Sequence, residues 1–311
     1  MADLKQLKYF IVCAKAGSFS EAAKLLYTTQ PSVSKAIKAL EDSMGVPLFE
    51  RLPRGISLTA RGREVYRYAC RIMKDVDILD EMSKERMTKW LRISLNPSSW
   101  FANRFVEFYN QNYEKNYHFQ IYTAGVRTVM ERVRDYLDDL GFVYIMEQQK
   151  EEFLYELAKN GLVFHPMQEI ASRFYPGRKN PMYAQKDGCG GVSLEQLKGI
   201  RFIQNYQDEF LNLGEKDRPD IFSWEGLDIA VLTNSDYIME RMLRESNVAN
   251  ISGSYLSKDQ KEAEHGIPLD FPKNKVVFGY VMHKGEEPDK ELAELIGFLE
   301  EKLQRDDPQE P

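Results

Sequence analysis

Apolar and polar positions alternate at helical spacing between residues 18 and 45. A short run from Ser18 to Leu26 carries small residues in its middle, and a second run follows Thr28 and Thr29. At about 3.6 residues per turn, the second run has one apolar side and one polar, basic side. The side predicted to be buried consists of Val33, Ala36, Ile37, Leu40 and Met44. This pattern predicts two helices joined by a tight turn, the second with a free polar face.

The ends of these helices carry start and stop signals. Ser18 and Glu21 have the spacing of a capping box, in which each side chain satisfies the backbone N–H of the other residue. Pro31 falls in the first turn of the second helix, where a missing N–H costs nothing. Gly45 is a candidate C-cap. The local signals therefore agree with the boundaries that the apolar pattern predicts.

A basic hairpin is predicted directly after the second helix. The stretch V-P-L-F-E-R-L-P-R-G-I-S-L-T, residues 46–59, has strand-forming ends around a Pro-Arg-Gly turn. Two helices followed by a basic hairpin are the layout of a winged helix-turn-helix, in which serine reaches base edges and lysine and arginine neutralise phosphates. An ordinary helical hairpin with a solvated charged face is the alternative. The candidate DNA-binding residues are Thr29, Gln30, Pro31, Ser32, Ser34, Lys35, Lys38, Arg51 and Arg54.

A long helix is predicted from Thr59 to about residue 84, because no proline occurs there and no glycine follows Gly62. Its apolar residues are spaced four, three, four and three apart, which is typical of a dimerisation seam. Two heads fixed in a dimer would read a palindromic DNA site. Packing of this helix against the chain's own body is the alternative. The seam consists of Val65, Ala69, Ile72, Val76 and Leu79.

After Trp90 the pattern changes to short apolar strands that alternate with amphipathic helices. This rhythm predicts a parallel sheet covered by helices on both faces, with strands first at 91–95, 118–123 and 140–145. In the helix after the second strand, the residues predicted to face inward are Val126, Val129, Met130, Val133 and Leu137. The later predicted elements are strands at 171–175, 200–204, 248–251 and 276–283 and helices at 194–198, 236–245 and 290–303, with a disordered tail at 306–311.

Charge is divided unevenly along the chain, whose 311 residues carry a formal net charge of −6. Residues 1–63 have ten Lys and Arg against five Asp and Glu, a balance of +5, so the rest of the chain carries −11. A basic head on an acidic body would direct DNA to one end of the molecule.

The remaining composition predicts a cytoplasmic protein with no membrane partner. No stretch approaches the ~20 apolar residues of a membrane span, and the polar start M-A-D-L-K-Q lacks the apolar core of a secretory signal. Cys13, Cys70 and Cys189 show no paired spacing, which favours a reducing compartment.

The run A-A-K-L-L-Y-T-T-Q-P-S-V-S-K-A-I-K-A-L-E-D-S-M-G-V-P-L-F-E-R at 22–51, continued by L-T-A-R-G at 58–62, resembles the LysR-type transcriptional regulators of bacteria. The resemblance extends over residues 2–305. It implies an N-terminal all-α winged helix-turn-helix with a long linker helix, and a C-terminal α/β two-lobed effector domain similar to periplasmic solute-binding proteins. The implied boundaries are 1–58 for the DNA-binding head, 59–89 for the linker, 91–167 with 269–305 for lobe I, and 168–268 for lobe II, with crossovers near Pro166 and Leu269.

The resemblance also implies partners. These are promoter double-stranded DNA, RNA polymerase, a small-molecule effector between the lobes, and further copies of the chain in a homodimer or a dimer of dimers, that is, a homotetramer. The chain departs from the family in the effector domain. Gly141 stands in place of the usual Asp, the bulky Val143 and Tyr144 replace a small residue, and Val126 and Arg127 replace a small polar pair. The identity of the effector therefore cannot be carried over.

Effector-binding residues are nominated by position, because ligands of two-lobed α/β proteins lie at the carboxyl ends of strands beside helix N-termini. Each polar residue there could instead be a helix cap or a solvated loop residue. Arg127 would suit a carboxylate, so an anionic effector is expected, and Tyr122, Tyr144 and Trp100 suggest a ring beside it. The nominated residues are Ser98, Ser99, Arg127, Thr128, Asn205, Asn234 and Ser235.

Enzymatic functions find no support in the motifs. The chain lacks G-x-S-x-G, H-E-x-x-H, G-x-x-x-x-G-K and Cys-x-x-Cys, and its four histidines are scattered, so no catalytic residue, metal or cofactor is predicted. Cys189 lies in a glycine-rich loop, but thiol sensing would need a resolving partner. The function predicted is a DNA-binding regulator that responds to an effector. A solute-binding or catalytic α/β protein with a merely structural N-terminal hairpin is the alternative.

Overall fold

A computed structural model describes residues 3–53, 55–82, 90–115, 117–185, 191–205, 227–253, 266–270 and 275–306 of the chain. They form two compact units, one from residues 1–88 with 134–137 and the other from residues 89–133 with 138–311. Arg54, Cys189, the end of the predicted linker at 83–89 and most of the predicted tail lie outside the described residues. Within the described residues, no helix is both long enough and apolar enough to cross a membrane.

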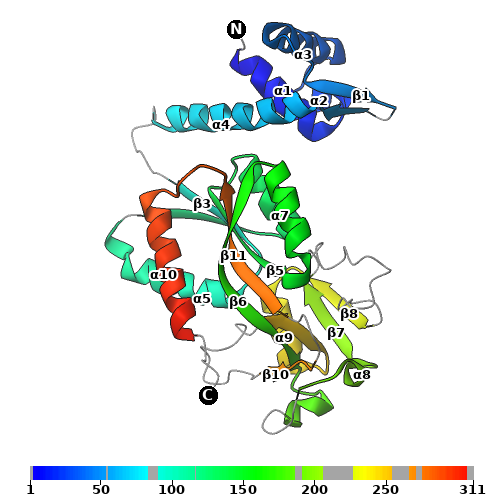
Figure 1. The fold of residues 1–311 in the computed structure, drawn as a ribbon, viewed down its shortest axis with the longest axis vertical. Helices are drawn as coiled ribbons and strands as arrows, with labels where there is room; N and C mark the ends of the chain where they lie inside the picture. The colour runs from blue at the N-terminus through cyan, green and yellow to red at the C-terminus, as the bar shows by residue number, and fades with distance from the viewer. Residues whose placement is uncertain are drawn as a thin grey trace. The chain divides into compact units, whose positions relative to one another are not determined.

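The first unit contains a helical head with a two-stranded wing (Figure 1). Its core is formed by the apolar faces of three short helices and the start of a longer one, with Phe10, Val33, Ile37, Leu40 and Leu48 almost fully buried. Its elements are α1 (Leu4–Ala16), α2 (Phe19–Leu25), α3 (Gln30–Met44), β1 (Phe49–Leu52), β2 (Gly55–Leu58) and α4 (Ala60–Met82).

The two predicted helices are confirmed as α2 and α3, with Ser18 and Gly45 as caps, although only one of the two bonds of the predicted capping box is seen at Ser18. The Ser18 side chain accepts a hydrogen bond from Glu21 N at the start of α2, and Thr29 is the N-cap of α3. The Glu21 carboxylate pairs with Lys24 at 2.9 Å. Gly45 ends α3 at φ 69°, in the left-handed region that glycine enters without steric cost. On the predicted buried face of α3, Val33, Ile37 and Leu40 are buried and Ala36 is half-buried, whereas Met44, in the last turn, is 36% exposed.

The wing is an antiparallel hairpin in which Phe49 pairs with Leu58 and Arg51 with Ile56. The hairpin is held against the helices by a hydrogen bond from Ile56 N to Gly17 O, at 2.8 Å. Gly55 has φ 132°, and a Cβ at this position would collide with the same carbonyl. Only glycine therefore fits at the close approach between the wing and the end of α1.

The long predicted helix is α4, and Thr59 caps it by accepting a hydrogen bond from Gly62 N at 2.9 Å. The predicted seam divides along its length. Ala69 is buried in the core of the head, whereas Ile72 is 42% exposed and Leu79 is 61% exposed. The first half of the seam thus packs within the unit, and the second half leaves apolar side chains uncovered in a single chain.

The second unit is an α/β domain in which the strands follow the order β4-β3-β5-β11-β6-β9-β7-β8 within the described residues, with β10 paired to β6. Its strands are β3 (Trp90–Leu95), β4 (His118–Thr123), β5 (Leu140–Met146), β6 (Leu162–Pro176), β7 (Arg201–Asn205), β8 (Asp228–Thr233), β9 (Ala249–Gly253), β10 (Ile267–Pro268) and β11 (Lys275–His283). Its α-helices are α5 (Ser99–Gln111), α6 (Val126–Arg134), α7 (Lys150–Lys159), α8 (Leu194–Leu197), α9 (Asp236–Glu245) and α10 (Lys290–Asp306).

Helices cover both faces of the first half of this sheet. Alternate residues of β11 show the two layers, because Phe278 packs with α5 and α10, and Val277 packs with α6 and α7 (Figure 1). Strands β3, β4 and β5 are parallel, as predicted, and so are β7, β8 and β9. The sheet is mixed, however, because β11 and β6 run antiparallel to their neighbours.

Strand β6 belongs to both halves of the sheet. Its residues up to Ala171 pair with β11, and those from Ser172 to Pro176 pair with β9. The prediction of a separate strand at 171–175 was therefore wrong, since this segment is the end of one continuous strand. The division into two lobes at Pro166 and Leu269 stays a prediction, and the second unit contains both predicted lobes except residues 134–137.

Further differences lie in helices. The pattern predicted neither α1, which begins with an Asp3 capping box, nor α7. Leu137 was predicted to face inward from the helix that begins at Val126, but α6 ends at Arg134 and Leu137 is 45% exposed. The other four predicted inward residues of α6 are buried. Asp306, which was predicted to begin the disordered tail, is the last residue of α10.

Candidate functional site

The polar face of α3 begins with a hydroxyl pair. Thr29 Oγ1 lies 2.9 Å from Ser32 Oγ, and it also accepts from Ser32 N at 3.4 Å, so the cap fixes the first turn of the helix. The predicted residues on this face are all on the surface. Thr29, Gln30, Pro31, Ser32, Lys35 and Lys38 are exposed, and Ser34 is half-buried.

The opposite face of α3 is fixed, because Val33, Ile37 and Leu40 are each at most 2% exposed. The exposed face therefore has one orientation relative to the head. Arg51 is also exposed, on the first strand of the wing. Hydroxyls and ammonium groups on a helix, together with a guanidinium on the wing, are the chemistry that contacts base edges and phosphates.

A second polar cluster lies at the carboxyl ends of β3, β4 and β5. Asn96 is 5% exposed and connects these strands, since its Nδ2 donates to Ala124 O at 3.0 Å and its Oδ1 accepts from Tyr144 N at 2.9 Å. Ser98, the N-cap of α5, accepts from Phe101 N and lies 2.8 Å from the hydroxyl of Tyr144. The start of α5 is thus tied to the adjacent strand.

Ser99 brings the start of α5 against the start of α9. Its hydroxyl lies 3.1 Å from a carboxylate oxygen of Glu240 and 3.5 Å from one of Asp236. The pKa of Asp236 is raised to about 6, mainly by burial and also by the negative charge of Glu240, while the hydrogen bond from Ser99 acts in the opposite direction. Two carboxylates of α9 therefore approach a nominated serine of α5.

The other nominated residues are distributed over three helix or strand ends. Arg127 is exposed and Thr128 is half-buried, both in the first turn of α6. Asn234 is exposed, and Ser235 caps α9 by accepting from Ile238 N. Asn205 is the last residue of β7, and its side chain lies outside the description. Among all the nominated residues, Ser99 is the one for which a contact with the first turns of α9 is described.

The aromatic residues expected beside Arg127 have structural partners. Trp100 is 3% exposed and packs edge-on against Phe278 in the core, so it does not offer a ring to a ligand. The ring of Tyr122 is covered by the guanidinium of Arg132, 4.0 Å from its centroid. Tyr144 stacks on Phe278 at 4.6 Å, and its hydroxyl points to Ser98.

Sequence reasoning missed Asn96, Asp236 and Glu240 as members of this cluster. Asn96 follows an apolar strand directly, and this position is a usable signal for a polar residue at a sheet edge. Asp236 and Glu240 lie four residues apart on one helix face, but their contact with Ser99 spans 137 and 141 positions of sequence. No local pattern encodes such a contact.

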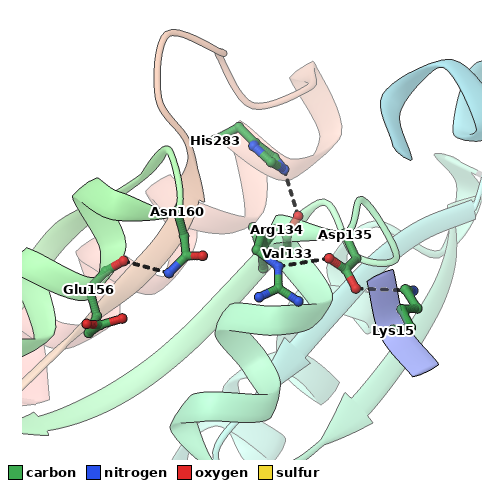
Figure 2. A network of polar contacts seen from close by, with 7 residues as sticks. All are labelled: Lys15, Val133, Arg134, Asp135, Glu156, Asn160 and His283. Atoms are coloured by element: carbon green, nitrogen blue, oxygen red, sulfur yellow. Dashed lines mark hydrogen bonds and ion pairs between the residues drawn. The ribbon is translucent and has the colours of Figure 1, made fainter. Parts of the chain in front are cut away.

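His283 and the two described cysteines, Cys13 and Cys70, are buried. His283 is 6% exposed, and its Nε2 lies 2.7 Å from Val133 O at the end of α6, near a second contact in which Asn160 Nδ2 donates to Glu156 O (Figure 2). Burial raises the pKa of Cys13 to about 12 and that of Cys70 to about 11, which keeps both thiols protonated. Among the described residues, no group of three or more potential metal ligands is brought together.

Comparison with known proteins identifies the family. Residues 4–63 match the family described as "Bacterial regulatory helix-turn-helix protein, lysR family". The HTH-type transcriptional activator CmpR of Synechocystis sp. is 31% identical over 273 residues, which cover 83% of this chain and 87% of CmpR. The chain belongs to the LysR-type transcriptional regulators. Members of this family are DNA-binding regulators with effector-binding domains, so the predicted family and function are confirmed.

Two further comparisons are with a second relative and with a solved structure. The HTH-type transcriptional regulator BenM of Acinetobacter baylyi is 31% identical over 144 residues, which span 45% of this chain and about half, 47%, of BenM. The solved structure of a full-length OxyR variant from Pseudomonas aeruginosa has a TM-score of 0.53 at 14% identity and covers 96% of this chain and 98% of OxyR. This likeness concerns the fold, and it confirms the predicted class, a winged helix-turn-helix with an α/β effector domain.

Proposed function

We propose that this LysR-type regulator binds promoter DNA through the exposed face of α3 and the wing, and that a small molecule held in the α/β unit alters this binding. The observation that carries the first part is the division of α3. Its apolar face is buried in the head, while the hydroxyl and lysine side chains of its first turns are exposed. The proposed contacts are Thr29, Gln30, Pro31, Ser32, Ser34, Lys35, Lys38, Arg51 and Arg54.

The assembly that we infer is a homodimer, or a homotetramer built as a dimer of dimers, joined through the second half of α4. Ile72 and Leu79 are apolar, exposed and seven residues apart on this helix. A partner helix would remove both from water, at about 25 cal/mol per Å² of apolar surface buried. Such a dimer presents two α3 helices to a palindromic site, and RNA polymerase at the promoter is the partner on which regulation would act.

The effector site that we propose lies at the carboxyl ends of the strands, between the starts of α5, α6 and α9. Helix N-termini favour polar and anionic groups. In support, the described residues leave Gln204 Nε2 and Asn250 Oδ1, both buried near the end of β7, without a hydrogen-bond partner. The proposed ligand residues remain Ser98, Ser99, Arg127, Thr128, Asn205, Asn234 and Ser235, with Arg127 as the partner of an anionic group.

A salt titration of DNA binding tests the first part. Phosphate contacts by lysine and arginine release counterions, so log affinity should fall linearly with log salt, with a slope near −0.9 for each neutralised phosphate. A solute-binding or catalytic α/β protein with a merely structural hairpin would show no such dependence. The relatives named above are transcriptional regulators, which agrees with the absence of an enzymatic role in this proposal.

A thermal-shift screen against metabolites tests the second part. A ligand at 100 times its dissociation constant stabilises the folded chain by about 2.7 kcal/mol. The affinity of each ligand found is then measured for the parent and for Arg127→Ala. This change should reduce the affinity for an anionic ligand by more than about tenfold. An unchanged affinity would remove the anion hypothesis, and an equal loss for a neutral ligand would show that Arg127 acts in another way.

A further inference from the structure

Tyr27, in the turn between α2 and α3, combines an exposed aromatic side chain with a left-handed backbone conformation. Its side chain is 98% exposed, so the ring has almost no contact with the rest of the chain. Its backbone has φ 52°, in the left-handed region that residues with a Cβ rarely enter. The backbone of the turn is itself well defined, since Tyr27 N donates to Lys24 O at 3.1 Å and Thr28 N to Ala23 O at 2.9 Å.

Folding does not explain a tyrosine at this position. A left-handed backbone costs free energy for any residue except glycine, and asparagine tolerates it better than an aromatic residue does. An exposed ring recovers none of that cost by burial. Tyr136, the other described non-glycine residue with positive φ, is half-buried and therefore differs. A residue that neither relieves strain nor fills the core points to contact with another molecule.

The place of Tyr27 in the head indicates what it meets. It precedes Thr29, the N-cap of α3, by two residues. Consecutive Cα atoms are about 3.8 Å apart, so Tyr27 stays within about 8 Å of the cap. In a helix-turn-helix, the first residues of the reading helix enter the major groove, which is about 12 Å wide, and the preceding helix crosses the DNA backbone. Residues in the turn between the two helices therefore lie along the rim of the groove, where the phosphates are.

The chemistry of the side chain fits that surrounding. A tyrosine hydroxyl is one of the donors that proteins use for phosphate oxygens. Such hydrogen bonds are charge-assisted, and they fix the position of a protein on the duplex without reading its sequence.

We propose that the hydroxyl of Tyr27 donates a hydrogen bond to a phosphate oxygen at the rim of the groove that α3 enters. This inference rests on the proposed DNA-binding function. It assigns to Tyr27 a positioning contact, which increases affinity for every DNA sequence alike. Because a hydroxyl brings no positive charge to displace a counterion, the contact leaves the salt dependence of binding unchanged.

The test compares Tyr27→Phe and Tyr27→Gly in the full-length chain, with binding to a labelled random-sequence duplex measured by fluorescence anisotropy over a range of salt. Phenylalanine removes the hydroxyl alone, and glycine removes the side chain while accepting the left-handed backbone. Both variants should bind about tenfold more weakly than the parent with the same salt slope. Tyr113→Phe, at a tyrosine that is 73% exposed in the second unit, is the matched control and should bind as the parent does.

The outcomes are distinct. Parental affinity in Tyr27→Phe would overturn the proposal, whether or not Tyr27→Gly is weakened, because the hydroxyl would then make no contact. A melting temperature of Tyr27→Phe below that of the parent would indicate a structural role and would also overturn it. A parent chain that leaves the duplex unbound at every salt concentration would instead overturn the proposed DNA-binding function, and this inference with it. Weakened binding of both variants with unchanged slope and melting temperature supports the contact.

Discussion

The hydroxyl of Ser99 lies 3.1 Å from a carboxylate oxygen of Glu240, although the two residues are 141 positions apart in the chain. Asp236 approaches the same hydroxyl at 3.5 Å. A serine hydroxyl has one proton to donate, so two ionised carboxylates compete for it and repel each other. The contact between the starts of α5 and α9 is therefore sensitive to the charge on this pair.

The first prediction concerns pH. The pKa of Asp236 is raised to about 6 in the folded chain, mainly by burial, against about 3.9 for an unperturbed aspartate. A raised pKa means that the folded state binds the proton more tightly, so the stability contributed by this group is fully present below about pH 4 and is lost as the pH rises through about 6. Asp236→Asn should therefore melt at a higher temperature than the parent at pH 8, with the difference vanishing near pH 4.

Thermal denaturation between pH 4 and pH 8 measures this difference. Glu195→Gln is the control, because the Glu195 side chain is 79% exposed and should alter the profile little. Parallel curves for Asp236→Asn and the parent would mean that Asp236 titrates alike in the folded and unfolded chains.

The second prediction concerns α3. Lys35→Ala should weaken DNA binding and reduce the magnitude of the salt slope by about one, because one phosphate contact is lost. Ser34→Ala should weaken binding with no change in the slope. Neither change should lower the melting temperature. Ile37→Ala provides the contrast, since Ile37 is 2% exposed and its truncation should cost about 2–5 kcal/mol of stability. Unfolding of the Lys35 variant would show that the polar face of α3 is misassigned.

The third prediction concerns assembly through α4. Ile72→Glu and Leu79→Glu each place a carboxylate on the exposed half of the seam, where burial in a dimer would cost several kcal/mol. Light scattering should show a smaller oligomer, and DNA binding should weaken because two heads no longer act together. The folded head should survive, since both side chains are already exposed. Asp75→Lys, at an exposed position off the seam, is the control. An unchanged mass for both seam variants would place the interface elsewhere.

The fourth prediction concerns Asn96. Asn96→Ala removes the acceptor for Tyr144 N and the donor to Ala124 O in a buried site, and each unsatisfied group costs about 1–3 kcal/mol. The melting temperature should fall, whereas Asn110→Ala, at an exposed position of α5, should leave it near that of the parent. Equal melting temperatures for these two alanine variants would show that water replaces the asparagine.

The head was predictable because its signals are local. Ser18 and Gly45 cap their helices at the expected residues, since a cap depends on residues within one turn. Helix α9 was also predicted with its observed ends, Asp236 and Glu245. By contrast, α1 has an equally local capping box at Asp3 and Gln6, and this signal was present in the sequence but not used.

Strand β6 was the main error, because a strand was predicted only at 171–175 and the boundary near Pro166 came from the family resemblance. Proline in a strand interior normally argues against a central strand. The structure accommodates Pro166 opposite Gly279, at a point where the register between β6 and β11 shifts. A Cβ at Gly279 would collide with His165 O, so the irregularity depends on a glycine more than 100 positions away. The candidate site shows the same limit, because Ser99 was nominated from its own helix start but its carboxylate partners were not.

The continuity of β6 has a mechanical consequence for any response to an effector. The strand runs unbroken from Leu162 to Pro176 and exchanges its partner β11 for β9 at Ser172. Rotation of one half of the sheet against the other would therefore twist β6 and strain its hydrogen bonds to both neighbours. Because β6 crosses this point as a continuous strand, we expect rotation there to be small and reversible.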